Sequence, residues 1–170
     1  MTEVNATGFS GDSDPYPYIG GILGFTSSGS DFATGSYDYA VIGATTATAV
    51  HATPATGPNA FTAATGIPEP IQSAIWSLSN GNILTAQWVN SDSSTPKTYI
   101  VDSSGILALT GDPTQLQNVL GTKVSVDTLM FVCTQGCAVP ASVPEPSAMP
   151  LALFGLAVLL GHAKSQRLPG

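Results

Sequence analysis

Few side chains in this 170-residue sequence could perform chemistry, and they are scattered. The histidines are His51 and His162, and the glutamates Glu3, Glu69 and Glu145 lie in loop-like or proline-bounded contexts. Most of the aspartates fall in turn sequences, where Asp is favoured because it hydrogen-bonds the nearby backbone. The sequence also lacks a nucleophile elbow, a phosphate-binding loop and a zinc pattern. We therefore expect no catalytic residue, no cofactor site and no metal site, and we predict that the protein is not an enzyme.

The two cysteines, Cys133 and Cys137, lie four residues apart near the end of the body of the chain. In an oxidising compartment they would form a disulfide that closes a small loop, and in a reducing one they would remain thiols. Neither His51, which we expect in a surface loop, nor His162 completes a metal site with them. The pair Asp12 and Asp14 is predicted to lie in a solvated turn, because Ca²⁺ requires six or more oxygen ligands.

The amino-acid composition indicates an exported protein and argues against a nucleic-acid-binding one. Charged residues make up 9 % of the chain, against roughly 25 % in typical soluble domains. Their place is taken by Gly, Ser, Thr, Ala and Asn, a mixture typical of short strands joined by many turns and of exported proteins. The formal net charge is −7, and Lys97 and Lys123 are the only basic residues before position 144. Nucleic-acid binding requires a basic face, so we exclude it.

The strongest structural signal lies in residues 74–110. Asn80-Gly81 separates two runs rich in apolar and β-branched residues, which predicts a hairpin with a two-residue turn and places Trp76 and Trp88 in one core. A turn around Gly105 joins two further runs, so this region is predicted to form a four-stranded meander. Residues 19–25 and 37–46 are predicted strands as well.

A short helix is predicted within residues 111–121, with Asp112 as its N-cap, Pro113 in its first turn and Gly121 as its stop. Residues 124–132 alternate and predict one strand with its valines and Met130 facing inward. The fold class predicted is mainly β: an antiparallel β-sandwich-like domain with one short helix, plus a C-terminal hydrophobic helix. Residues 53–66 are predicted to be a long connection.

We divide the chain into an irregular N-terminal segment, a β-rich domain, a linker with a Pro-Glu-Pro motif, a hydrophobic helix and a short basic tail. These parts cover residues 1–18, 19–137, 138–147, 148–163 and 164–170. The apolar stretch 149–163 is predicted to enter the membrane. The cations Lys164 and Arg167 favour the cytoplasmic side, which would place the body across the membrane.

In the tail, Val143, Pro144, Glu145, Pro146 and Ser147 are followed by a Gly- and Leu-rich apolar stretch and then by cations. This order of features resembles the PEP-CTERM sorting signal of exported bacterial proteins. This resemblance covers about the last 27 residues and implies recognition by an exosortase, a membrane transpeptidase-like enzyme that processes the tail. It also implies delivery to the cell envelope or extracellular surface, with membrane anchoring at least in passing and a polysaccharide matrix as a further partner.

Several alternatives stay open. The apolar stretch is short for a membrane span, so a plain membrane anchor or a helix packed on the domain is an alternative to a sorting signal. Residues 1–8 are not a signal peptide, although an exported protein is expected to have one. Residues 67–71 repeat the Pro-Glu-Pro sequence in mid-chain and are predicted to be a loop.

The function predicted is that of an exported surface or matrix protein of unknown molecular role. The first alternative is a carbohydrate- or ligand-binding β-sandwich module, suggested by Trp76, Trp88 and the tyrosines. The second is a secreted or membrane-anchored β protein of fungal type, because stretches of residues 74–112 are similar to such proteins.

Overall fold

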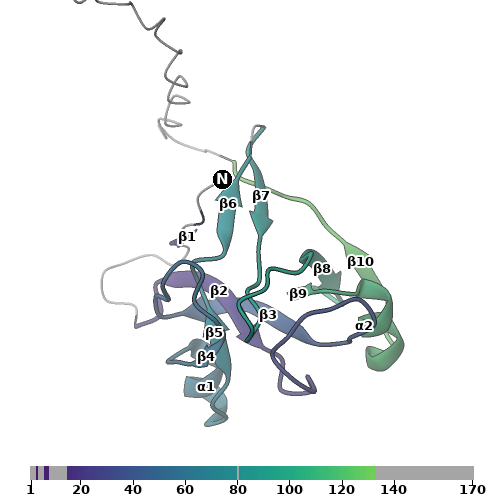
Figure 1. Ribbon diagram of the computed structural model, residues 1–170, viewed down its shortest axis with the longest axis horizontal. Coiled ribbons are helices and arrows are strands. Elements are labelled where there is room, and N and C mark those ends of the chain that lie inside the picture. Colours follow the sequence, from purple (N-terminus) through teal and green to yellow (C-terminus); the bar gives the residue numbers. More distant parts are fainter. Residues whose placement is uncertain (1–2, 4–5, 8–14, 80, 133–170) are drawn as a thin grey trace, which may run out of the picture. The chain divides into compact units, whose positions relative to one another are not determined.

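A computed structural model describes residues 3, 6–7, 15–79 and 81–132, which form two antiparallel β-sheets and two short helices (Figure 1). The strands are β1 (Ala6–Thr7), β2 (Tyr18–Leu23), β3 (Tyr39–Thr45), β4 (Ala55–Thr56), β5 (Pro70–Gln72), β6 (Trp76–Leu78), β7 (Ile83–Ala86), β8 (Tyr99–Ser103), β9 (Ile106–Thr110), β10 (Val124–Val126) and β11 (Leu129–Met130). The helices are α1 (Ala60–Thr65) and α2 (Pro113–Leu120). The mainly β antiparallel class predicted from the sequence is confirmed.

The larger sheet has the strand order β10-β8-β9-β3-β2-β5-β4, and β1 pairs with β2. Because side chains alternate along a strand, cross-strand partners define the two faces of this sheet. One face carries the row Ile71, Ile22, Val41, Ala108 and Val101, each residue paired with the next. The sheet is therefore apolar on this face as well as on the opposite one, which covers the main core.

The main core lies against the second face of the larger sheet and is built around Trp88. Its indole ring is fully buried, stacks on Phe32 with ring centroids 4.8 Å apart, and donates its N–H to the Ser30 carbonyl at 2.8 Å. Gly21 provides the room, since a β-carbon there would lie 2.7 Å from the indole ring. Trp76 belongs to the same core cluster and donates to the Ile19 carbonyl. The prediction that both tryptophans share one core is confirmed.

The smaller sheet consists of β6, β7 and β11, and its β6–β7 hairpin rises above the larger sheet in Figure 1. The hairpin was predicted correctly, but its register was not. A two-residue turn would pair Trp76 with Thr85, whereas Trp76 lies opposite Ala86. The loop is one residue longer because Asn82 joins the turn, with Gly81 and Asn82 both at positive φ.

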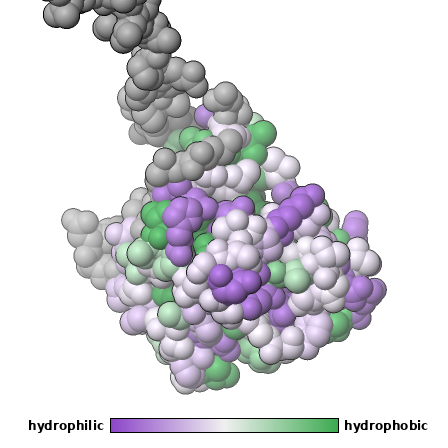
Figure 2. Space-filling model, viewed as in Figure 1, coloured by the Kyte–Doolittle hydropathy of each residue, from purple (hydrophilic) through white to green (hydrophobic). Residues whose placement is uncertain are grey.

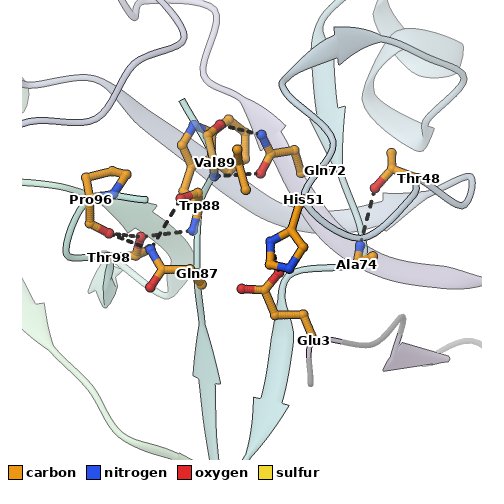
Figure 3. A network of polar contacts seen from close by, with 10 residues as sticks. All are labelled: Glu3, Thr48, His51, Gln72, Ala74, Gln87, Trp88, Val89, Pro96 and Thr98. Atoms are coloured by element: carbon orange, nitrogen blue, oxygen red, sulfur yellow. Dashed lines mark hydrogen bonds and ion pairs between the residues drawn. The ribbon is translucent and has the colours of Figure 1, made fainter. Parts of the chain in front are cut away.

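Two buried amide side chains connect segments that no strand ladder joins. Gln72 receives a hydrogen bond from the Val89 N–H at 3.0 Å and donates to the Val89 carbonyl at 2.6 Å (Figure 3). Asn90 does the same with Phe32, at 2.8 Å and 3.0 Å. Each side-chain amide thus satisfies both backbone groups of one residue, as a neighbouring strand would, and together they connect the Trp88 segment to β5 and to the loop before β3.

Two sequence predictions about the strands are wrong. Residues 74–110 do not form one meander, because β6 and β7 lie in the smaller sheet while β8 and β9 lie in the larger one. Residues 124–132 are not one strand, because β10 pairs with β8 and β11 pairs with β7. The chain crosses between sheets at residues 127–128. As a result Val126, Met130 and Val132, which were expected to face inward, are exposed.

The helices follow local sequence signals. For α2 the prediction is confirmed: Asp112 accepts from the backbone N–H groups of Thr114 and Gln115, and Gly121 ends the helix at φ 66°. α1 lies where a connection was predicted. Its own signals are Asn59, whose side chain accepts from the Thr62 N–H, and a left-handed Gly66. The loop predicted over residues 67–71 is only partly a loop, because strand β5 begins at Pro70.

Asp112 also ties α2 to a distant loop, because its second carboxylate oxygen accepts from the Gly35 N–H at 2.9 Å. The hydrogen bonds from Gly35, Gln115 and Thr114 lower the pKa of Asp112. A carboxyl group with a lowered pKa stabilises the folded state at pH values above its ordinary pKa. This stabilisation is lost as the pH falls through the pKa that the group has in the folded state.

We therefore expect Asp112→Ala to lower the melting temperature at pH 7 and to differ less from wild type as the pH falls below about 4, near the ordinary Asp pKa. Asp112→Asn keeps a good N-cap but does not titrate, so it should show no such pH dependence. Melting curves from pH 7 to pH 2 measure both effects. An unchanged gap between wild type and Asp112→Ala across this range would contradict the assignment.

The predicted C-terminal hydrophobic helix, residues 148–163, lies outside the described residues. Within the described ranges, neither helix has the length and apolar character needed to span a bilayer.

Candidate functional sites

An apolar groove runs over the open face of the larger sheet, between α1 and α2. Its floor includes Ile22, Val41 and Ile106, and its volume is about 490 Å³. The floor is apolar because β2, β3 and β9 direct Ile22, Val41, Ala108 and Ile106 to the same face of the sheet. Ile106 is 57 % exposed as a result.

The two ends of the groove differ in chemistry. Phe25, which follows β2, and Phe61 of α1 stack with ring centroids 6.4 Å apart, and both line the groove. The side of α2 and the β8–β9 turn contributes hydroxyl groups instead. Ser103 and Thr122 hydrogen-bond each other there at 3.1 Å. The groove thus has an aromatic end and a hydroxyl end.

A second, more open hollow adjoins the hydroxyl end. It is lined by Lys123 and the C-terminal turn of α2, and it shares Thr122 with the groove. Lys97, the other basic residue of the described part, lies 4.4 Å from the Tyr99 ring centroid in a cation–π contact. Among the residues that the structure describes, no ion pair of Lys123 is found.

Most of the described aspartate side chains accept hydrogen bonds from backbone N–H groups rather than gathering in a cluster. Asp38 is buried and accepts from the backbone of Ser28 and Gly29 and from the Ser36 hydroxyl. Four more accept from backbone N–H groups: Asp92 and Asp102 within turns, from Ser94 and Gly105, Asp112 from the α2 backbone, and Asp31 from the distant Ser91. Within the described ranges, no group of three or more His, Cys, Asp or Glu side chains could hold a metal ion.

His51 lies on the surface, as the sequence indicated, in a left-handed turn conformation with φ 59°. Its Nδ1 lies 3.5 Å from a carboxylate oxygen of Glu3 (Figure 3). A neighbouring turn is fastened by Thr48, which accepts from the backbone of Ser73 and Ala74. The pair of Glu3 and His51 joins two segments that are far apart in the sequence.

The tryptophans do not form a carbohydrate platform. Trp76 is 1 % exposed and Trp88 is 0 % exposed, so neither ring offers a face to a sugar. The exposed aromatic residue of the groove is Phe25, which sequence reasoning missed because it ends a predicted strand and has its partner Phe61 in a helix that was not predicted. Figure 2 shows a view in which hydrophobic residues are scattered among weakly polar ones.

The predicted sorting residues and the cysteines Cys133 and Cys137 lie outside the described residues. The mid-chain repeat of the motif is described. Its Glu69 is partly buried, and desolvation raises its pKa. Pro70 pairs with Thr56 of β4, so this copy of the motif is joined to the larger sheet.

No curated protein and no solved structure matches this chain. One family model does match, over residues 142–167, and it describes the PEP-CTERM protein-sorting motif. The matched range includes the motif residues singled out from the sequence, together with the apolar stretch and both terminal cations. The resemblance of the tail to the PEP-CTERM protein-sorting motif is therefore confirmed over residues 142–167.

Proposed function

We propose that this chain is a non-catalytic surface or matrix protein, exported and then processed by an exosortase at its C-terminal tail. The observation that carries the proposal is the PEP-CTERM match over residues 142–167. The motif suggests an exported, envelope-associated protein and recognition by an exosortase. The match also favours this interpretation over a fungal-type secreted protein.

In this proposal the apolar stretch 149–163 enters the membrane, and the enzyme acts near Pro144-Glu145-Pro146. A transpeptidase-like enzyme needs an extended, accessible segment, and the prolines of this motif favour extended backbone. Lys164 and Arg167 would remain on the cytoplasmic side. Removal of the tail would then release the β domain to the surface or to a polysaccharide matrix.

The described part of the chain supports a non-catalytic role in this proposal. A catalytic site usually joins several titratable groups in a cleft. Here most of the described aspartates hydrogen-bond the backbone, and the lining of the groove is mainly apolar, with hydroxyl groups at one end. We infer that the domain acts by its surface rather than by a reaction.

The test is expression of the chain in an exosortase-bearing host, with mass spectrometry of the mature C-terminus. Wild type should lose its tail, whereas replacement of Pro144, Glu145 and Pro146 by alanine should leave Gly170 in place and the protein in the membrane fraction. The matched control replaces Glu69 of the mid-chain repeat by alanine and should be processed like wild type. An intact Gly170 in the wild-type protein would overturn the proposal.

A further inference from the structure

The groove between α1 and α2 departs in composition from the surface around it. The sequence is rich in Gly, Ser and Thr, yet this face gathers aliphatic and aromatic side chains, and Phe25 and Ile106 are 66 % and 57 % exposed. Exposed apolar patches of this kind commonly mark a binding surface. All the residues that line the groove belong to the β domain.

The size of the groove suits a small molecule. Its 490 Å³ lies within the range of roughly 300 to 1,000 Å³ that is typical of small-molecule sites. Its floor of Ile22, Val41 and Ile106 offers dispersion contacts but no hydrogen-bonding side chain. A sugar would lose water from its hydroxyl groups there without gaining partners, which is unfavourable. An alkyl chain has no such cost.

The hydroxyl end of the groove adds a polar requirement. Ser103 and Thr122 can bond a head group, and Lys123 lines the hollow that shares Thr122. Residues 1–143 hold ten acidic residues and two basic ones, so most of this surface repels an anion. Lys97 is already engaged with Tyr99. Charge complementarity therefore favours an anionic head group at Lys123.

We propose that the groove binds one alkyl chain bearing an anionic head group, with the chain over Ile22, Val41 and Ile106 and the head group beside Thr122 and Lys123. The ligand class is a fatty acid or another single-chain anionic amphiphile. Phe25 and Phe61 close the far end of the groove against the chain.

The experiment measures displacement of the fluorescent probe N-phenyl-1-naphthylamine from the full-length chain. Three competitors with the same twelve-carbon chain are used below their critical micelle concentrations: laurate, dodecanol and dodecyltrimethylammonium. Laurate should displace the probe best and the cationic amphiphile least. An exposed ion pair is worth up to about 1 kcal/mol, so Lys123→Gln should weaken laurate by about threefold to fivefold and leave dodecanol unchanged.

Ile106→Asn should weaken all three competitors by about tenfold, because it removes apolar contact area from the floor. The matched control is Val126→Asn, since Val126 is 58 % exposed on a strand of the same sheet but does not line the groove. Every variant carries the same C-terminal segment, so any probe bound by this segment contributes the same background signal to each measurement. Far-UV circular dichroism and the melting temperature establish that each variant is folded.

Three results would overturn the proposal. One is equal weakening by Ile106→Asn and Val126→Asn, and another is equal displacement by the anionic and cationic amphiphiles. The third is a dimer in analytical ultracentrifugation that Ile106→Asn dissociates, because the occupant would then be a second copy of the chain.

Discussion

Gln72→Glu is expected to destabilise the β domain by about 3–5 kcal/mol at pH 7, the usual cost of an uncompensated buried charge. Gln72 is 1 % exposed and donates to the Val89 carbonyl at 2.6 Å. The substitution replaces this donor with a buried carboxylate oxygen that faces a carbonyl oxygen. Small domains are stable by only about 5–15 kcal/mol, so a large share of the stability would be lost.

The effect of Gln72→Glu should depend on pH in a direction that identifies its cause. Burial raises the pKa of the introduced carboxyl above its ordinary value of about 4.3. The folded state then binds the proton more tightly than the unfolded state, so the penalty is complete above the raised pKa and shrinks as the pH falls toward 4.3. The protonated form can again donate to the Val89 carbonyl. Urea unfolding at pH 7 and pH 4.5, with wild type beside it, measures this recovery.

Gln87→Glu is the matched control. Gln87 donates to the Pro96 carbonyl, also at 2.6 Å, but it is only half-buried, so water can reach the new carboxylate (Figure 3). A typical hydrogen bond contributes about 1 kcal/mol, and we expect a loss of that size with little pH dependence. If the two variants lost equal stability, Gln72 would not be the buried connector described above.

Trp88→Ala is expected to cost about 3–5 kcal/mol, the range found for large-to-small changes at buried aromatic positions. Trp88 fills the space above Gly21, stacks on Phe32 and bonds the Ser30 carbonyl. A β-carbon cannot replace these contacts, and the cavity would lie between the larger sheet and the segment that precedes β8. Chemical denaturation followed by far-UV circular dichroism measures the loss.

Two further variants separate the contributions to this effect. Phe25→Ala removes an aromatic ring that is 66 % exposed, so it should cost much less than Trp88→Ala. Trp88→Phe keeps most of the ring stacking but leaves the Ser30 carbonyl without its donor, which should cost about 1–3 kcal/mol. A Trp88→Ala variant as stable as Phe25→Ala would contradict the assignment of Trp88 to the centre of the core.

The elements that could be predicted from the sequence are those specified by neighbouring residues. Ser104 and Gly105 both have positive φ, as the turn between β8 and β9 requires, and the strands on either side pair as expected. Asp112 and Gly121 mark the ends of α2 in the same local way. α1 carried comparable signals in Asn59 and Gly66, but its six residues of Ala, Thr and Phe show no clear apolar stripe.

What could not be predicted depends on contacts between distant segments. The alternation of residues 124–132 is real, but a period of two does not say which sheet each part joins. Likewise, Gln72 and Asn90 are polar and suggest exposure, whereas their burial follows from peptide groups 17 and 58 residues away. The groove also depends on contacts between distant segments, because its aromatic end is formed by Phe25 and by Phe61 of α1.

The hydrogen bonds that hold the loops determine how the stability of this domain depends on salt concentration. Amide, hydroxyl and aspartate carboxylate groups hold them by hydrogen bonds, and within the described ranges the one contact between an acidic and a basic side chain is that of Glu3 and His51. Dissolved electrolyte weakens attraction between charges but leaves neutral hydrogen bonds largely intact. It also relieves the mutual repulsion of an acidic body. We therefore expect the stability of the domain to change little with ionic strength.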